Sequence, residues 1–253
     1  MQNDYLVDTH CHIHEPYELP LKEVFEASHD ALVKQVICVG TNVESSQQAI
    51  TFAEKNEGVF AAIGVHPHDT DGGYGQIAAL ARTGSSKLVA VGEIGLDYFY
   101  THSPKEVQIE ALKQQIEVAL KHNLPIIFHV REAFDDFWPI FEQYEGIRGV
   151  LHSFTDSKQN MQKAIDKGLY IGVNGISTFT KDEVQKATFD SIPLDRILFE
   201  TDAPFLTPAP YRGKINQPAY VKIVAEHHAS RRDISLKEIA AASTQNARTL
   251  FGF

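Results

Sequence analysis

The sequence is poor in cysteine, because its 253 residues include only Cys11 and Cys38. Two cysteines cannot form the disulfide framework that supports small secreted folds, so we expect buried thiols and a cytoplasmic protein. Long hydrophobic runs are also missing. No run reaches the ~18 apolar residues that a membrane span requires, and the N-terminal residues lack the basic region of a secretory signal peptide. We therefore expect no membrane partner.

Positive charge is scarce as well. Lys and Arg total 23 against 33 Asp and Glu, which gives a formal net charge of −10. This balance argues against broad, sequence-independent binding to a polyanion, which relies on clustered Lys and Arg. It leaves room for a site at which bound cations supply the positive charge. The sequence does not reveal the oligomeric state, and a monomer is the favoured expectation.

Short apolar runs recur along the chain with helical patterns between them. Because they are almost wholly apolar rather than alternating, they predict parallel strands that are covered on both faces. The expected strands are Leu6–Asp8, Gln35–Val39, Phe60–Gly64, Val89–Gly92, Pro125–Phe128, Gly149–Leu151, Tyr170–Gly172 and Ile197–Glu200. Eight such units predict an α/β fold, a (β/α)8 TIM barrel that forms a single domain over residues 1–253. The alternative is an open doubly wound sheet.

The clearest helix signal covers Ser103–His122. Ser103 is a suitable N-cap, Pro104 suits the first helical position, and Glu106 would complete a capping box.

Residues that can bind metals follow six of the expected strands. His10 and His12 come first, and their i, i+2 spacing places both imidazoles on one face of a strand. In a (β/α)8 barrel the active site lies at the C-terminal ends of the strands. The other residues at such ends are His66, Glu93, His129, His152, Glu200 and Asp202. A single histidine after a strand is typical of a structural role, but this coincidence over six strands predicts a metal centre.

The donor types suggest two divalent metal ions. His10, His12 and Asp202 can hold one ion, His129 and His152 can hold a second, and Glu93 has two oxygens with which to bridge them. Two ions about 3.5–4 Å apart lower the pKa of a shared water and bind both oxygens of an in-line displacement. Mixed nitrogen and oxygen ligands suit Zn²⁺ or Mn²⁺, and Mg²⁺ where waters complete its shell.

Two residues near these ligands have open roles. Glu200 lies two residues before Asp202, so it is a ligand of a further metal, a base, or a partner that orients a histidine. His66 either binds a scissile phosphate or a third metal, or is a loop histidine held by Pro67.

Substrate contacts are expected from two loops. Arg131, two residues beyond His129, suits a phosphate oxygen, and its alternative is an ion pair with a carboxylate. The proline-rich segment 207–218 carries Arg212 and Asn216, which suit an anionic group above the metals. The aromatic run 98–100 could stack on a base, although we expect at least two of its three rings to pack beneath the loop.

Several motifs together resemble the TatD family of metal-dependent deoxyribonucleases. They are Asp8-Thr9-His10-Cys11-His12, Gly64-Val65-His66-Pro67-His68, Gly92-Glu93-Ile94-Gly95-Leu96-Asp97-Tyr98, His129-Val130-Arg131, His152-Ser153-Phe154 and Glu200-Thr201-Asp202-Ala203-Pro204. The resemblance covers the whole chain. It implies a TIM barrel of the amidohydrolase superfamily, divalent metals, and hydrolysis of DNA phosphodiesters, often as a 3′-to-5′ exonuclease.

The resemblance also implies site residues. By position, the metal ligands are His10, His12, Glu93, His129, His152 and Asp202. Glu93, Asp202, His66 and Glu200 are the implied catalytic positions. The late loop departs from the family pattern, because Gln217 stands where family members often have an acidic residue.

Two functions follow as hypotheses. The first is a deoxyribonuclease that cleaves single-stranded DNA or DNA ends with a metal-activated water. The second is a hydrolase of a small phosphoester, lactone or amide on the same barrel. The acidic net charge favours the second, whereas Glu93 at the bridging position, rather than a lysine that could be carboxylated, favours the first.

Overall fold

The computed structural model describes residues 5–100 and 102–253. Its contacts divide into two compact units: unit 1 combines the residues up to Ile37 with Ser153–Gly252, and unit 2 combines Cys38–His152 with Phe253. The single domain over residues 1–253 stays a prediction. Residues 1–4, to which part of the signal-peptide prediction applies, lie outside the described residues.

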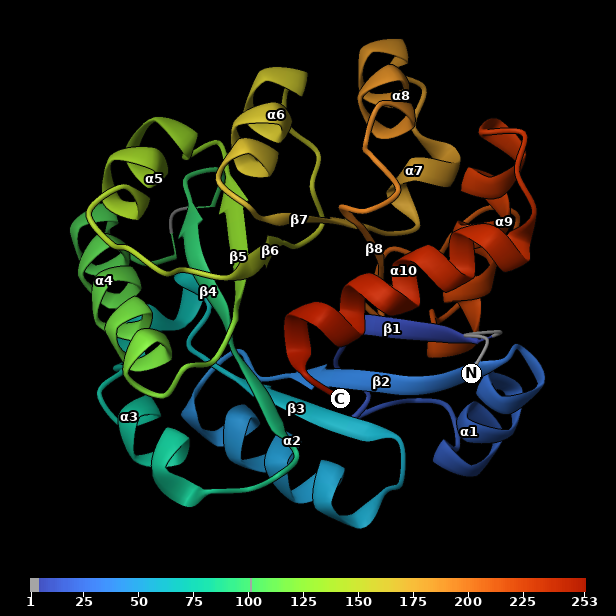
Figure 1. Cartoon of the computed structure of the whole chain (residues 1–253). Coiled ribbons are helices and arrows are strands. Elements are labelled where there is room, and N and C mark those ends of the chain that lie inside the picture. The colour runs from blue at the N-terminus through green and yellow to red at the C-terminus, as the bar shows by residue number, and fades with distance from the viewer. Residues whose placement is uncertain (1–4, 101) are drawn as a thin grey trace. The chain divides into compact units, whose positions relative to one another are not determined.

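Strands and helices alternate along the chain (Figure 1). The strands follow one another in sequence order in the sheet, as a (β/α)8 topology requires. Each of the eight expected strands is present. They are β1 (Leu6–Cys11), β2 (Val33–Val39), β3 (Val59–Ile63), β4 (Leu88–Asp97), β5 (Ile126–Arg131), β6 (Gly149–Leu151), β7 (Tyr170–Val173) and β8 (Ile197–Phe199).

The helices of unit 1 are α1 (Leu21–Asp30), α6 (Lys158–Asp166), α7 (Ile176–Phe179), α8 (Glu183–Asp190), α9 (Val221–Arg231) and α10 (Leu236–Phe251), with the 3-10 turn η3 (Pro218–Tyr220). Those of unit 2 are α2 (Val43–Lys55), α3 (Ile77–Leu80), α4 (Lys105–Lys121) and α5 (Phe134–Phe141), with the 3-10 turns η1 (Pro67–Gly72) and η2 (Ala81–Thr83).

In unit 1, helix α10 is hydrogen-bonded to β8 and to the residue before β1, the strands that lead to Asp202 and His10. It lies along β1 (Figure 1). Its Thr244 hydroxyl donates to the Tyr5 carbonyl at 2.7 Å, and its Ser243 hydroxyl accepts from the Phe199 N–H at 3.3 Å. Strand β8 pairs in parallel with β7, and a parallel bridge joins Cys11 to Ala203. The ends of β1 and β8 are therefore held side by side.

In unit 2, two buried glutamines of helix α4 form hydrogen bonds with the backbone at the ends of β3 and β4. The Gln115 side chain accepts from the Val65 N–H at 2.7 Å and donates to the Val65 carbonyl at 3.2 Å. Gln108 binds the backbone N–H and carbonyl of Asp97 in the same way, at 2.9 and 3.1 Å. Because buried polar groups need partners, these pairs fix both strand ends against α4.

Two local predictions differ from the structure. Strand β4 runs five residues further than Gly92, so Glu93 and Asp97 lie within it. The capping box is wrong, because α4 begins at Lys105 after Pro104 and has no side-chain cap. The Ser103 hydroxyl instead donates to the His68 carbonyl at 3.0 Å and accepts from the Asp71 N–H at 3.2 Å. Its hydrogen bonds thus hold the loop after β3.

Both cysteines are buried thiols that are not joined in a disulfide, as predicted. Among the described residues, none of the helices combines the length and the apolar character that crossing a bilayer requires.

One histidine in the core of unit 1, His228, is expected to destabilise the folded state at low pH. The His228 ring on α9 is fully buried, with its centre 5.7 Å from that of Phe199. Among the described residues, neither of its ring nitrogens has a hydrogen-bond partner. Burial lowers the pKa of His228 to about 3; the neighbouring His227 and Arg232 act in the same direction, and Asp190 opposes them.

We expect His228→Leu to flatten the dependence of stability on pH. Between about pH 6.5 and pH 3, His228 is protonated in the unfolded chain but stays neutral in the folded chain. The free energy of unfolding therefore falls as pH falls. For one group the slope approaches ~1.4 kcal/mol per pH unit. Urea unfolding at pH 7, 6 and 5 measures it. His29→Leu, at an exposed position, should keep the wild-type slope. An unchanged slope in His228→Leu would contradict the prediction.

Candidate metal centre

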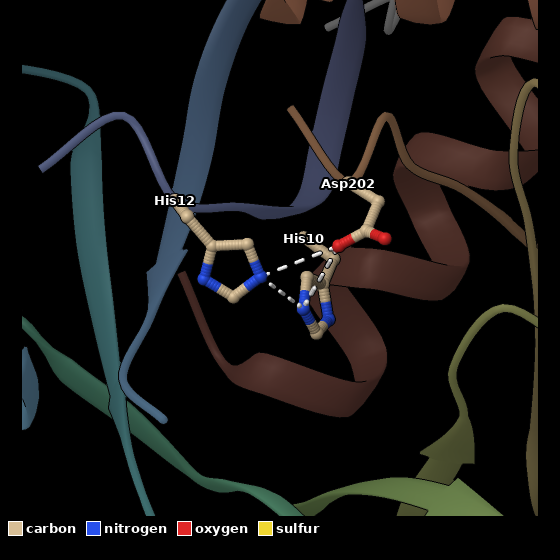
Figure 2. A group of neighbouring side chains, drawn as sticks. All are labelled: His10, His12 and Asp202. Carbon is tan, nitrogen blue, oxygen red and sulfur yellow. Dashed lines mark hydrogen bonds and ion pairs between the residues drawn. The ribbon is translucent and has the colours of Figure 1, made fainter. Parts of the chain in front are cut away.

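Three predicted ligands converge in unit 1. The Nε2 atoms of His10 and His12 lie 3.3 Å apart. The Oδ1 atom of Asp202 lies 3.3 Å from His12 Nε2 and 3.7 Å from His10 Nε2. Figure 2 shows the three side chains pointing toward one another. Both histidines are buried, whereas Asp202 is partly open to solvent. We call these residues the first cluster.

The first cluster fits a divalent cation. Ligand atoms held at ~2.0–2.2 Å in a tetrahedral arrangement around zinc lie roughly 3.4 Å from one another. The three observed separations of 3.3, 3.3 and 3.7 Å match this value closely. Two imidazoles and a carboxylate are also typical ligands of Zn²⁺ and Mn²⁺.

A buried carboxylate that the sequence reasoning missed holds the first cluster together. Asp8 accepts hydrogen bonds from the Thr201 N–H at 2.8 Å and the Thr201 hydroxyl at 2.5 Å. Next to this pair, the Asp202 N–H donates to the His10 carbonyl at 2.8 Å. Burial raises the pKa of Asp8 to about 8, although the bonds from Thr201 oppose this. The end of β1 is thus tied to the segment that carries Asp202.

A second cluster forms in unit 2 around one carboxylate oxygen. The Oε1 atom of Glu93 lies 2.8 Å from His129 Nδ1, 3.6 Å from His152 Nε2 and 3.8 Å from His66 Nε2. Glu93 is buried, and so is His152. Burial lowers the pKa of His66 to about 3, so its imidazole is neutral at pH 7. A neutral imidazole beside a carboxylate is a suitable metal ligand.

Asp97 orients the second cluster, although the sequence reasoning assigned it no role. Its Oδ2 atom lies 2.9 Å from His129 Nε2 and 3.0 Å from His68 Nε2. Burial lowers the pKa of His129, but the hydrogen bonds to Asp97 and Glu93 outweigh it and raise the value to about 9. Burial raises the pKa of Asp97, but its bond with His129 and its backbone bonds bring it well below its usual range.

The position of Asp97 carried a usable signal. It lies four residues after Glu93 on one strand, and even spacings along a strand return to the same face. Ending the expected strand at Gly92 hid this relation. Gly95 stands between the two carboxylates with φ of +156°, and a Cβ there would lie 1.7 Å from the His129 carbonyl oxygen. Glycine is therefore required for β4 to approach β5.

We expect Asp97→Asn to weaken metal binding about 10–100-fold, the usual effect of losing a carboxylate that orients a metal-binding histidine. The amide removes the negative charge that fixes the His129 ring. Metal titration by calorimetry measures the change. Asp135→Asn, at an exposed carboxylate on α5, is the control. Equal affinities in both variants would argue against this positioning role.

Glu200 lies in unit 1, fully buried, with Oε1 accepting from the Ser153 N–H at 2.6 Å. A Cβ on Gly172 would lie 2.5 Å from Glu200 Oε2, so the carboxylate depends on glycine there. This geometry suits the orienting role among the three alternatives, and the role stays a prediction.

The predicted substrate residues lie in different surroundings. The exposed Arg131 guanidinium lies 3.8 Å from the centre of the Phe99 ring. Arg212 is exposed, stacks on Phe179 at 3.8 Å and donates to the Thr207 carbonyl. Both still present charge to solvent.

Asn216 differs from its predicted role as a substrate contact. It is fully buried, and its amide donates to the carbonyls of Thr201 and Phe205 at 2.8 and 2.5 Å. Because backbone groups occupy its donors, we assign Asn216 to positioning the loop.

The aromatic run after β4 also differs from expectation. Phe99 is 49% exposed and Tyr100 is 43% exposed, so the prediction that at least two of the three rings pack beneath the loop is wrong. The cause is local: both backbone N–H groups donate to Asp97 Oδ1, at 3.0 and 3.1 Å. These bonds tie the turn to Asp97, and both rings are left partly open to solvent.

Comparison with known proteins shows the family of this chain. The sequence profile of TatD related DNase matches residues 7–252. The chain belongs to this family. A relative from Bacillus subtilis, the uncharacterized metal-dependent hydrolase YabD, is 39% identical over 97% of this chain and 98% of its own. The 3′-5′ ssDNA/RNA exonuclease TatD of Salmonella typhimurium is 34% identical over 90% and 92%. Deoxyribonuclease Tat-D of Schizosaccharomyces pombe is 34% identical over 86% and 83%.

A solved structure agrees with the family assignment. The crystal structure of YjjV, a TatD homologue from Escherichia coli, covers all of this TatD-family chain and all of its own, with a TM-score of 0.93 and 28% identity. The resemblance of the motifs to the TatD family is therefore confirmed. The (β/α)8 barrel fold class and the assignment as a metal-dependent hydrolase of this family are confirmed with it.

Proposed function

We propose that this TatD-family protein hydrolyses DNA phosphodiester bonds with two divalent cations, each Zn²⁺, Mn²⁺ or Mg²⁺. The observation that carries the proposal is the pair of clusters, each with donor atoms of several side chains gathered at metal-ligand spacing. Two of the relatives described above are named as nucleases, which supports DNA as the substrate.

The proposed ligand sets follow the clusters. His10, His12 and Asp202 would hold one cation, His129 and His152 would hold the other, and Glu93 would be a ligand that both could share. When bound, the cations lower the pKa of a water and neutralise charge on the phosphate.

The chain's own groups then have defined tasks. Asp202 Oδ2 points away from both histidines (Figure 2), so it is the proposed acceptor of the proton from the attacking water. His66 is neutral at pH 7 and can donate a hydrogen bond to a phosphate oxygen. Glu200 orients the segment at Ser153, and the exposed Arg131 and Arg212 contact further phosphates.

The test uses single-stranded and duplex oligonucleotides that carry a label at either end. Wild-type protein with Zn²⁺, Mn²⁺ or Mg²⁺ should shorten single-stranded DNA from its 3′ end, and His129→Ala should not. A panel of small phosphoesters, lactones and amides is assayed in parallel. Hydrolysis of that panel without cleavage of any DNA would overturn the nuclease proposal in favour of a small-molecule hydrolase.

We also propose that the protein acts in the cytoplasm as a monomer. The two buried cysteines, which form no disulfide with each other, support a reducing compartment.

A further inference from the structure

The exposed aromatic side chains are concentrated on two loops. Among the described residues, seven large apolar side chains are exposed, and four of these are aromatic. Phe99 and Tyr100 follow β4, which carries Glu93 and Asp97; Phe205 and Tyr211 follow β8. Exposed apolar surface is unfavourable in water, so its concentration at such loops indicates binding.

The pair after β4 is rigidly connected to the second cluster. One carboxylate serves both: Asp97 Oδ1 accepts from the N–H groups of Phe99 and Tyr100, and Asp97 Oδ2 faces His129 Nε2 at 2.9 Å. The Tyr98 N–H also donates to the Arg131 carbonyl at 3.0 Å, which ties the turn to β5. The backbone that carries the two rings is therefore held next to His129, the proposed metal ligand.

The chemistry of this surface suits a nucleobase. The Arg131 guanidinium lies 3.8 Å from the Phe99 ring centre and 5.1 Å from that of Tyr100. Tyr100 stacks on His102 with ring centres 5.6 Å apart and planes inclined by 25°. Flat π surfaces with an adjacent cation bind bases of any sequence by stacking. In a protein of net charge −10, stacking supplies affinity that general phosphate attraction cannot.

We propose that Phe99, Tyr100 and Arg131 form a stacking platform for an unpaired nucleobase next to the phosphodiester bond that is cleaved. This rests on the proposed function and extends it to the choice of substrate. Bases within a duplex are already stacked on their neighbours, so the platform selects single-stranded ends. It tolerates all four bases, because each has a π face.

The test compares two single-stranded oligonucleotides that differ only in an abasic residue at the 3′ end. Phe99→Ala/Tyr100→Ala should lower kcat/KM on the normal oligonucleotide about 5–150-fold, as expected for the loss of base stacking. It should leave the abasic substrate unchanged. Phe99→Trp should retain activity, and Val184→Ala, an exposed apolar residue on α8, is the control.

Binding of a fluorescent oligonucleotide, followed by anisotropy, separates the two proposals because it does not require cleavage. Weaker binding by the double variant supports the platform, even where wild-type protein cleaves no DNA and the nuclease proposal fails. Equal binding by wild type and double variant overturns the platform. Equal losses of kcat/KM on the normal and abasic substrates also overturn it, because they indicate a purely structural role of the loop.

Discussion

Glu93→Gln is expected to lower DNA hydrolysis about 10³-fold or more while the protein remains folded. The loss of transition-state stabilisation by a metal amounts to several kcal/mol, and each ~1.4 kcal/mol is a factor of ten in rate. Glu93 is the critical position because one of its oxygens faces three histidines, the nearest at 2.8 Å. An amide keeps the shape of the side chain and removes its charge. Initial rates on a labelled oligonucleotide measure the effect.

The matched control for this variant is Glu57→Gln, at an exposed carboxylate in the same unit. It should hydrolyse DNA at the wild-type rate. Circular dichroism and metal content are recorded for both variants, so that a misfolded protein is recognised. A folded Glu93→Gln variant that retains wild-type metal content and rate would refute the assignment of this residue to the metal centre.

Removal of bound metal is expected to lower the melting temperature by roughly 8–16 °C. A ligand at a thousandfold excess over its Kd stabilises the folded state by ~4 kcal/mol, and each kcal/mol corresponds to about 2–4 °C in a chain of this size. The first cluster gives the physical reason, because the folded chain brings the donor atoms of His10, His12 and Asp202 within 3.3–3.7 Å of one another, and the unfolded chain does not. Scanning calorimetry before and after chelation measures the shift.

We also expect the effect of the metal on the melting temperature to depend on pH. Because the pKa of His129 is raised to about 9, its imidazole carries a proton at pH 7 that a metal must displace. Metal affinity, and with it the shift in melting temperature, should therefore fall as pH falls from 9 to 6. His12→Ala should show a smaller shift at every pH. Identical melting temperatures with and without chelator would show that the clusters hold no metal.

Hydrophobic patterning predicted the fold well because the sequence of a buried parallel strand is a short apolar run. Each of the eight runs became a strand, and the ligands at their ends gathered into clusters. Patterning failed where polar residues extend a strand. Strand β4 continues through Glu93 to Asp97 because it pairs with β5 as far as Asp97, where Gln108 of α4 also binds its backbone. Composition does not reveal such a partner, and because the expected strand ended at Gly92, the spacing of Asp97 from Glu93 was not used.

The late loop shows a second limit of sequence reasoning. Asn216 in a proline-rich, charged segment suggests contact with an anion, since nothing local shows which way its amide turns. In the structure both of its donor bonds go to backbone carbonyls, one of them at Thr201 beside the first cluster. The sequence also does not show which backbone groups a possible capping residue contacts. The Ser103 hydroxyl binds the His68 carbonyl and the Asp71 N–H in the loop after β3, and does not cap the helix.

The two glutamines of α4 make that helix a spacer for the second cluster. Gln108 and Gln115 are seven residues apart, close to two full turns, so both face the sheet. One holds the strand end that leads to His66, and the other holds Asp97. Inserting one alanine between them would turn one glutamine by ~100° and shift it ~1.5 Å along the helix axis. Such an insertion would remove one of these two backbone contacts without altering any ligand, so the register of α4 against the strand ends helps to hold the second cluster in place.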